Sequence, residues 1–203
     1  MQHYHALTRG LARLAKALFL GMLLGQFWFA HAQTEGGVAP TPDVATVEFV
    51  NNYKLGPGDI ISIRVLGEQE LSIEKARISD VGTIPMPAIG EVNALGRTIG
   101  EVERMVVEKL RGRILLNPQV SVLIEEYRPF FINGMVQKPG GYPFLPGLTV
   151  RKAAALAGGF RERASLKKIY LIRESDKTQT PVNVDLNAAV LPGDIVTVEE
   201  SFF

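Results

Sequence analysis

Cysteine is absent from the 203-residue sequence, and histidine occurs only near the start, at His3, His5 and His31. A chain without thiols has no cysteine nucleophile, no disulfide and no cysteine to carry a lipid anchor. If the first 32 residues are removed on export, the chain also lacks a histidine general base and an ordinary zinc site. We therefore predict that the protein is not an enzyme, has no catalytic residues and uses no cofactor or metal.

The first 32 residues have the three parts of a secretory signal peptide. Its positive start consists of Arg9, Arg13 and Lys16. An apolar run over residues 17–30 follows, and Ala30-His31-Ala32 is the small-x-small pattern that signal peptidase accepts. The run is shorter than the ~20 apolar residues of a membrane-spanning helix, although a retained anchor is the alternative. We predict cleavage between Ala32 and Gln33.

Removal of that segment leaves 19 basic and 21 acidic residues, a net charge of −2. A balance so close to zero, with no basic stripe, argues against a nucleic-acid partner.

Residues 33–51 show little periodicity and contain Gly36-Gly37, Pro40 and Pro42. Because glycine and proline interrupt regular structure, we predict that residues 33–51 form a flexible segment leading into the first domain.

A first domain, with strands and one helix, is predicted over residues 52–128. Its expected strands lie at 60–66, 76–79, 83–86, 89–93 and 119–127. A Pro-Gly turn at residues 55–59 precedes the first strand, in which apolar and polar residues alternate. Thr98 and Glu101 have the spacing of a capping box, and the apolar residues after them recur at helical spacing. The domain is therefore expected to be of the α+β class.

A second domain is predicted over residues 129–203. Its expected strands lie at 130–136, 142–145, 168–173, 182–184 and 195–199. Thr149 is placed to cap a helix that runs to residue 157, and Gly158-Gly159 suits the end of that helix. One short helix on a few strands is the β-grasp pattern, so the whole chain is predicted to be α+β.

A Pro-Gly-Asp turn that leads into an alternating strand occurs twice, ending at Asp59 and at Asp194. These carboxylates could bind sugar hydroxyls. The simpler interpretation, which we favour, is that each accepts backbone N–H groups of its own turn.

Three other features allow a functional interpretation. The pairs Glu125-Glu126 and Glu199-Glu200 suggest a glycosidase, but neighbours on a strand point to opposite faces and cannot converge on one bond. The aromatic residues of the second domain could stack on sugars, although core packing is the commoner role. The third feature is a cationic group, which is either a solvated surface or a contact with a polymer or another subunit. It consists of Arg161, Arg163, Lys167 and Lys168.

The order of motifs over residues 53–203 resembles the polysaccharide export protein family, the outer-membrane auxiliary proteins of capsule and exopolysaccharide systems. Leu55-Gly56-Pro57-Gly58-Asp59 resembles the start of its export domain, and Pro139-Gly140-Gly141-Tyr142 resembles the one soluble-ligand-binding β-grasp (SLBB) domain that follows. Structural turns carry most of this resemblance. They contain Gly56, Pro57, Gly58, Asp59, Gly82, Gly90, Gly134, Gly140, Pro146, Gly147, Thr149, Gly158, Gly159, Gly193 and Asp194.

The resemblance implies a ring homo-oligomer in the periplasm, peripherally associated with the outer membrane, that forms a conduit for a capsular polysaccharide or exopolysaccharide. An inner-membrane polysaccharide co-polymerase is the expected partner on one side. The alternative is a monomeric periplasmic module that binds or senses a saccharide.

Two departures from the family pattern qualify that expectation. Met135 stands where family members usually have glutamate. The best-known members also have a lipidated cysteine, further β-grasp repeats and a C-terminal pore helix, none of which is visible in this sequence. Since a bilayer is spanned by helices or a closed barrel, we expect a separate outer-membrane β-barrel partner.

Overall fold

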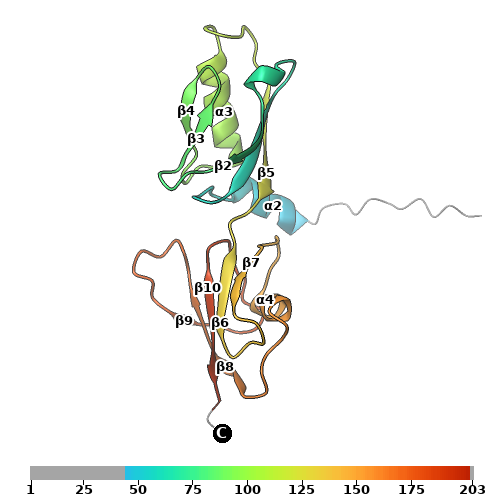
Figure 1. Ribbon diagram of the computed structural model, residues 1–203, viewed down its shortest axis with the longest axis vertical. Helices are drawn as coiled ribbons and strands as arrows, with labels where there is room; N and C mark the ends of the chain where they lie inside the picture. Colours follow the sequence, from blue (N-terminus) through green and yellow to red (C-terminus); the bar gives the residue numbers. More distant parts are fainter. Residues whose placement is uncertain (1–43, 202–203) are drawn as a thin grey trace, which may run out of the picture. The chain divides into compact units, whose positions relative to one another are not determined.

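A computed structural model of the chain describes residues 44–201, all of which belong to one compact unit, Pro42–Phe203 (Figure 1). The predicted signal peptide, its cleavage between Ala32 and Gln33, and most of the segment 33–51 lie outside the described residues. Among residues 44–201, no helix has the length and apolar character needed to cross a membrane.

Two hydrophobic cores organise the described residues. The first is built from residues between Tyr53 and Val122, and the second from residues between Phe130 and Val198. We call residues 53–126 the first lobe and residues 130–201 the second lobe; the linker 127–129 joins them (Figure 1). The predicted α+β class is confirmed, because each lobe combines strands with a helix. The domain limits 52–128 and 129–203 stay a prediction.

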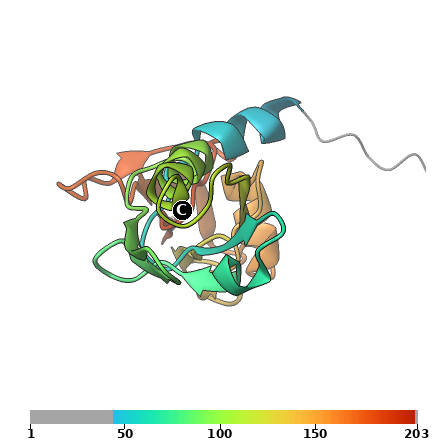
Figure 2. The same cartoon turned by 90° about the horizontal axis from the view of Figure 1, so that it is seen from above.

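The first lobe contains a three-stranded antiparallel sheet in the order β2-β1-β5, a β3–β4 hairpin, a short 3-10 helix and one α-helix. Its elements are β1 (Ile60–Val65), η1 (Gln69–Leu71), β2 (Ile73–Arg77), β3 (Thr83–Met86), β4 (Gly90–Asn93), α3 (Ile99–Leu110) and β5 (Val120–Glu126). Strand β1 buries alternate residues, as its sequence pattern predicts. Seen from above, α3 lies along one side of this lobe with the strands around it (Figure 2).

The N-terminus of α3 has the predicted capping box. Glu101 donates its backbone N–H to the Thr98 hydroxyl at 3.3 Å, and the Glu101 carboxylate accepts the Thr98 N–H at 2.7 Å. Lys54 forms an ion pair with the same carboxylate at 3.1 Å. The backbone hydrogen bond from Thr98 and the contact with Lys54 lower the pKa of Glu101 below its usual range.

The second lobe is a five-stranded sheet, in the order β7-β6-β10-β8-β9, with a helix packed on it (Figure 1). Its elements are β6 (Phe130–Gly134), β7 (Gly140–Tyr142), α4 (Val150–Leu156), β8 (Ala164–Ile172), β9 (Val182–Asn183) and β10 (Ile195–Glu200). Strand β10 pairs with β6 in parallel, while the other pairs are antiparallel. Thr149 caps α4 by accepting the Lys152 N–H, as predicted. This arrangement is the β-grasp that the sequence indicates.

The structure differs from the sequence-based expectation before the first lobe. Val44–Asn52 forms a helix, α2, where a flexible segment over 33–51 is predicted. Tertiary packing explains the difference, because Phe49 of α2 contacts the rings of Tyr53, Tyr127 and Phe144. A helix of nine residues is marginal alone in water, so packing of this kind stabilises it.

Two strands are displaced from their predicted places. Strand β7 ends at Tyr142, whereas a strand over 142–145 is predicted. Phe144 instead turns into the second core, where it is 4% exposed. A strand over 76–79 is predicted, but strand β2 occupies Ile73–Arg77. Its position is set by pairing with β1.

Replacement of Glu101 by glutamine should destabilise the fold at neutral pH, because the ionised carboxylate caps α3. A group with a lowered folded-state pKa stabilises the fold above its unfolded-state pKa and loses that effect as the pH falls through the folded-state value. The stability difference between Glu101→Gln and the parent protein should therefore shrink in acid. Urea unfolding from neutral to acidic pH checks this, with Glu108→Gln on the same helix as control. A difference that does not change with pH would contradict it.

Candidate functional site

The two Pro-Gly-Asp turns have the same internal geometry. Asp59 and Asp194 are 0% and 1% exposed. Asp59 accepts the N–H of Gly56 at 2.8 Å, and Asp194 accepts the N–H of Leu191 at 2.7 Å, in each case three residues earlier in the chain. This is the local role that the turn interpretation gives both carboxylates.

Each of these carboxylates also pairs with an arginine that follows a neighbouring strand. Arg128, two residues beyond β5, lies 2.9 Å from Asp59 through Nη1. Arg173, directly after β8, donates through Nη1 to Asp194. Strand β5 pairs with the strand after Asp59, and β8 pairs with the strand after Asp194. The chain thus uses one arrangement twice to neutralise a buried carboxylate.

Tyr53 extends the first of these arrangements. Its hydroxyl donates to Asp59 Oδ2 at 2.8 Å and accepts a hydrogen bond from Arg128 Nη1 at 2.6 Å. Burial, together with the negative charge of Asp59, raises the pKa of Tyr53 far above its usual value. Tyr53 therefore stays a neutral donor over the whole physiological pH range.

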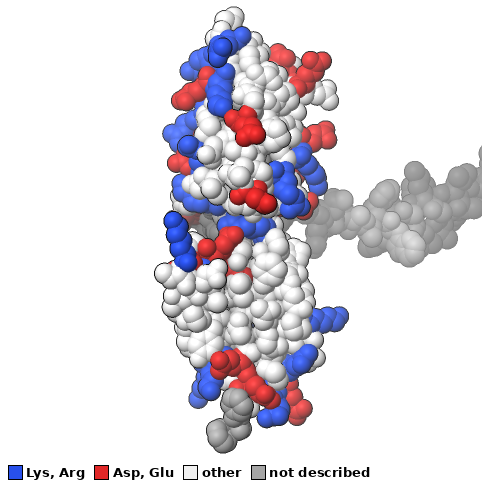
Figure 3. Space-filling model, turned by 60° about the vertical axis from the view of Figure 1, so that its left-hand side comes forward, with Lys and Arg blue, Asp and Glu red and all other residues white. Residues whose placement is uncertain are grey.

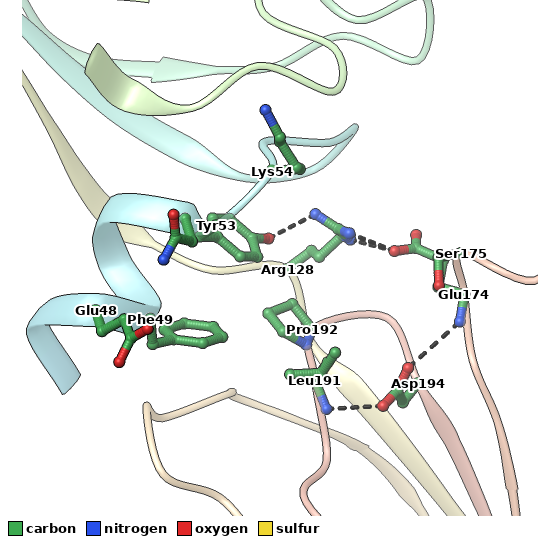
Figure 4. Close-up of a pocket in the computed structure, with 11 residues that line it drawn as sticks. Glu48, Phe49, Tyr53, Lys54, Arg128, Glu174, Ser175, Leu191, Pro192 and Asp194 are labelled. Atoms are coloured by element: carbon green, nitrogen blue, oxygen red, sulfur yellow. Dashed lines mark hydrogen bonds and ion pairs between the residues drawn. The ribbon is translucent and has the colours of Figure 1, made fainter. Parts of the chain in front are cut away.

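Arg128 connects the two lobes. It binds Asp59 of the first lobe and donates through Nε to Glu174 of the second lobe at 2.6 Å. Its side chain is 15% exposed. Asp59, Arg128 and Glu174 therefore form a chain of alternating charges across the junction. Figure 4 shows its link between Arg128 and Glu174.

Glycine at the two turns leaves room for this chain of charges. A Cβ at Gly56 would lie 2.7 Å from Arg128 Nη1. A Cβ at Gly193, which has a φ of +84°, would lie 2.3 Å from the Glu174 carboxylate. A larger residue at either position would displace one end of the network.

An aromatic cluster packs beside the charges. The ring centroid of Phe49 lies 5.5 Å from those of Tyr53 and Phe144 and 5.9 Å from that of Tyr127. Phe49 and Tyr127 pack against both hydrophobic cores. The cluster thus joins α2, the linker and the loop after β7.

A cavity of about 520 Å³ opens beside these charges and rings (Figure 4). Its walls come from α2 and the two residues after it, from the linker, from the segment after β8 and from the turn before β10. They include Phe49, Asn52, Tyr53, Arg128, Glu174 and Pro192. Within residues 44–201, no three His, Cys, Asp or Glu side chains gather as a metal site would require. The rings of Phe49 and Tyr53 and the polar side chains of Asn52 and Ser175 that line the cavity are groups that can contact an organic ligand.

Sequence reasoning identified part of this site and missed the rest. Asp59 and Asp194 were singled out, together with the glycines of their turns. Tyr53, Arg128 and Glu174 were not. One signal was available for Arg128. Each strand that begins after a Pro-Gly-Asp turn pairs with a strand that is followed by an arginine, and these arginines are Arg128 and Arg173.

The remaining predicted motif residues lie at turns and at the ends of strands and helices in both lobes, and they do not line the cavity. They are Gly82, Gly90, Gly134, Gly140, Pro146, Gly147, Thr149, Gly158 and Gly159. Their importance for function stays a prediction.

The cationic group lies on the turn before β8 and on β8 itself. Its members, Arg161, Arg163, Lys167 and Lys168, are all exposed and do not line the cavity. Arg163 forms an ion pair with Glu200 at 3.1 Å. On the face seen in Figure 3, charges of both signs are mixed where the second lobe ends, and the middle of that lobe is mostly uncharged. A polymer or subunit contact of these residues stays a prediction.

Two family profiles match the chain. Residues 48–125 match the polysaccharide biosynthesis/export protein profile, and residues 129–183 match the SLBB domain. The first profile covers the first lobe and part of α2, and the second covers the second lobe as far as β9. The resemblance inferred from the motifs is confirmed.

Three relatives align with the chain. The exopolysaccharide production protein ExoF of Rhizobium meliloti is 33% identical over 129 residues, which are 58% of this chain and 30% of that protein. The polysialic acid transport protein KpsD of Escherichia coli is 26% identical over 144 residues, 69% of this chain and 25% of that protein. The EPS I polysaccharide export outer membrane protein EpsA of Ralstonia nicotianae is 26% identical over 186 residues, 73% of this chain and 47% of that protein. The chain spans less than half the length of each.

Asp59→Asn should lower the free energy of unfolding by roughly 3–5 kcal/mol, because it breaks the buried ion pair with Arg128 and disturbs the carboxylate that Tyr53 also binds. The matched control is Glu126→Gln, which breaks the exposed ion pair with Lys75 at 3.2 Å. An exposed pair contributes only about 0–1 kcal/mol. Urea unfolding compares the two variants, and equal losses would contradict the assigned role of Asp59.

Tyr53 should not ionise until the fold is lost at high pH. Its raised folded-state pKa means that its contribution to stability is complete below about pH 10, the ordinary tyrosine value, and is lost as the pH rises beyond it. Tyrosinate absorbance followed through an alkaline titration measures this. Part of the tyrosinate absorbance should appear only at the high pH at which the fold is lost. This part should be missing in Tyr53→Phe and present in the control Tyr170→Phe. A titration without this part in the parent protein would refute the expectation.

Proposed function

We propose that this chain, whose residues 48–125 match the polysaccharide biosynthesis/export protein profile, is a component of a machine that exports a capsular polysaccharide or an exopolysaccharide. The observation that carries the proposal is the order of two profiles along one chain, with the export domain first and the SLBB domain directly after it. The names of the relatives, which refer to exopolysaccharide production, polysialic acid transport and polysaccharide export, support the same role.

The proposed role is that of a conduit, in which the protein encloses or guides the polymer and breaks no bond. The state of the buried carboxylates supports this. Asp59 and Asp194 are each paired with an arginine and hydrogen-bonded to backbone N–H groups, so neither is free to transfer a proton. Their geometry is that of structural groups that hold turns and lobes in place.

The proposal includes partners on both sides of the periplasm. An inner-membrane co-polymerase would deliver the polymer, copies of this chain would form a ring around it, and an outer-membrane β-barrel would receive it. The signal-peptide pattern of residues 1–32 supports a periplasmic location. Peripheral association with the outer membrane is supported by the name of one relative, an outer membrane protein.

Deletion of the protein in its source organism should remove polysaccharide from the cell surface and leave polymer inside the cell. Residues 33–203 behind an unrelated working signal peptide should restore export, because the proposed function resides in the two lobes. Quantitative assay of surface and cell-retained polysaccharide measures both. The variant Glu126→Gln is the control, and it should restore export as fully as the parent chain does. Surface polysaccharide that is unchanged by the deletion would overturn the proposed function in favour of a binding module.

A further inference from the structure

The junction cavity combines an apolar wall with a polar one. Phe49, Leu191 and Pro192 face it from α2 and from the turn before β10, and Glu174 and Ser175 lie on the opposite side (Figure 4). Its volume of about 520 Å³ is in the range of small-molecule sites, roughly 300–1,000 Å³. Such a cavity can accept a flat or ring-shaped ligand that has one apolar face and a polar edge.

Several polar groups that line the cavity have no hydrogen-bond partner within residues 44–201. The side chains of Asn52 and Ser175 make no hydrogen bond there, although both line the cavity. Arg128 binds only Oε2 of Glu174, which leaves Oε1 as a free acceptor. An amide, a hydroxyl and a carboxylate oxygen together offer donors and acceptors from two sides of the cavity, which suits a polyhydroxylated ligand.

The charges of the cavity disfavour an anionic ligand. Its two cations are already paired, Lys54 with Glu101 at 3.1 Å, and Arg128 with Asp59 and Glu174. The Glu48 carboxylate, by contrast, has no ion-pair partner among the described residues. A carboxylated or phosphorylated ligand would meet negative charge without a free cation to balance it. A neutral ligand meets no such cost.

We propose that this cavity binds one or two units of a neutral saccharide. A pyranose ring packs its apolar face on Phe49, and its hydroxyls bind Asn52, Ser175 and Glu174 Oε1. The proposal rests on the proposed function, since it names the kind of polymer that the chain meets, and it assigns the contact to the junction and not to the cationic group on β8.

The position of the site gives binding a second consequence. Phe49 and Asn52 belong to α2, whereas Glu174, Ser175 and Pro192 belong to the second lobe. A saccharide in the cavity therefore contacts both sides of the Arg128 connection and stabilises the arrangement that it binds. The melting temperature should rise with saccharide concentration, and this gives a readout independent of direct binding.

Saturation-transfer difference NMR on the exported protein tests the site. The neutral probes are maltotriose, cellotriose and mannotriose, and the acidic probe is trigalacturonate. We expect transfer to at least one neutral trisaccharide, with an affinity at least tenfold higher than for trigalacturonate. Absence of transfer to all three neutral probes, or equal binding of trigalacturonate, would overturn the proposal.

Variants locate the binding. Phe49→Leu keeps an apolar side chain in the aromatic cluster but removes the ring face, and it should weaken saccharide binding about tenfold. Phe131→Leu is the matched control, because Phe131 is 43% exposed on β6 and does not line the cavity. Asn52→Ala, at the exposed end of α2, should also weaken binding and keeps the test decisive if Phe49→Leu fails to fold. Equal binding by Phe131→Leu and both cavity variants would place the saccharide elsewhere and refute the site.

The site and the proposed function can fail separately. If neutral trisaccharides bind in the cavity but deletion leaves surface polysaccharide unchanged, the export role is wrong and the site remains. If deletion abolishes surface polysaccharide but no neutral trisaccharide binds, the site is wrong and the export role remains.

Discussion

The buried carboxylate of Asp59 is the constraint on which the arrangement of the junction depends. A charge that is 0% exposed has to be neutralised, and losing its partner would cost several kcal/mol. Arg128 neutralises it, and the chain leaving β5 must therefore pass close to the turn before β1. Because Arg128 also binds Glu174, the same requirement determines where the second lobe meets the first.

Two neighbouring residues of the segment after β8 connect the second Pro-Gly-Asp turn to the first. Arg173 binds Asp194, and the next residue, Glu174, binds Arg128. Two buried carboxylates are thus satisfied by one connected set of charges, of which Arg128, Glu174 and Asp194 line the cavity. A wall held by ion pairs and by aromatic packing is preorganised, and preorganisation lowers the cost of ordering a site when a ligand binds.

Local signals predicted local structure well. The capping box at Thr98 and Glu101, the cap at Thr149 and the hairpin strand Thr83–Met86 were all found from residue types at short spacing. The family was found in the same way, from the order of turn motifs. The helix α2 was missed because its sequence has little periodicity and no acidic first turn, and its stability comes from Phe49 packing on rings far along the chain.

The sequence by itself determined the α+β class, most elements and the family resemblance, because these depend on hydrophobic period, caps and turn residues that act over a few positions. Only the tertiary structure decided the site. Arg128 lies 69 residues from Asp59, and Glu174 lies 46 residues from Arg128. A charged residue has many possible partners along a chain, and strand pairing selects one of them by bringing two distant segments to the same end of a sheet.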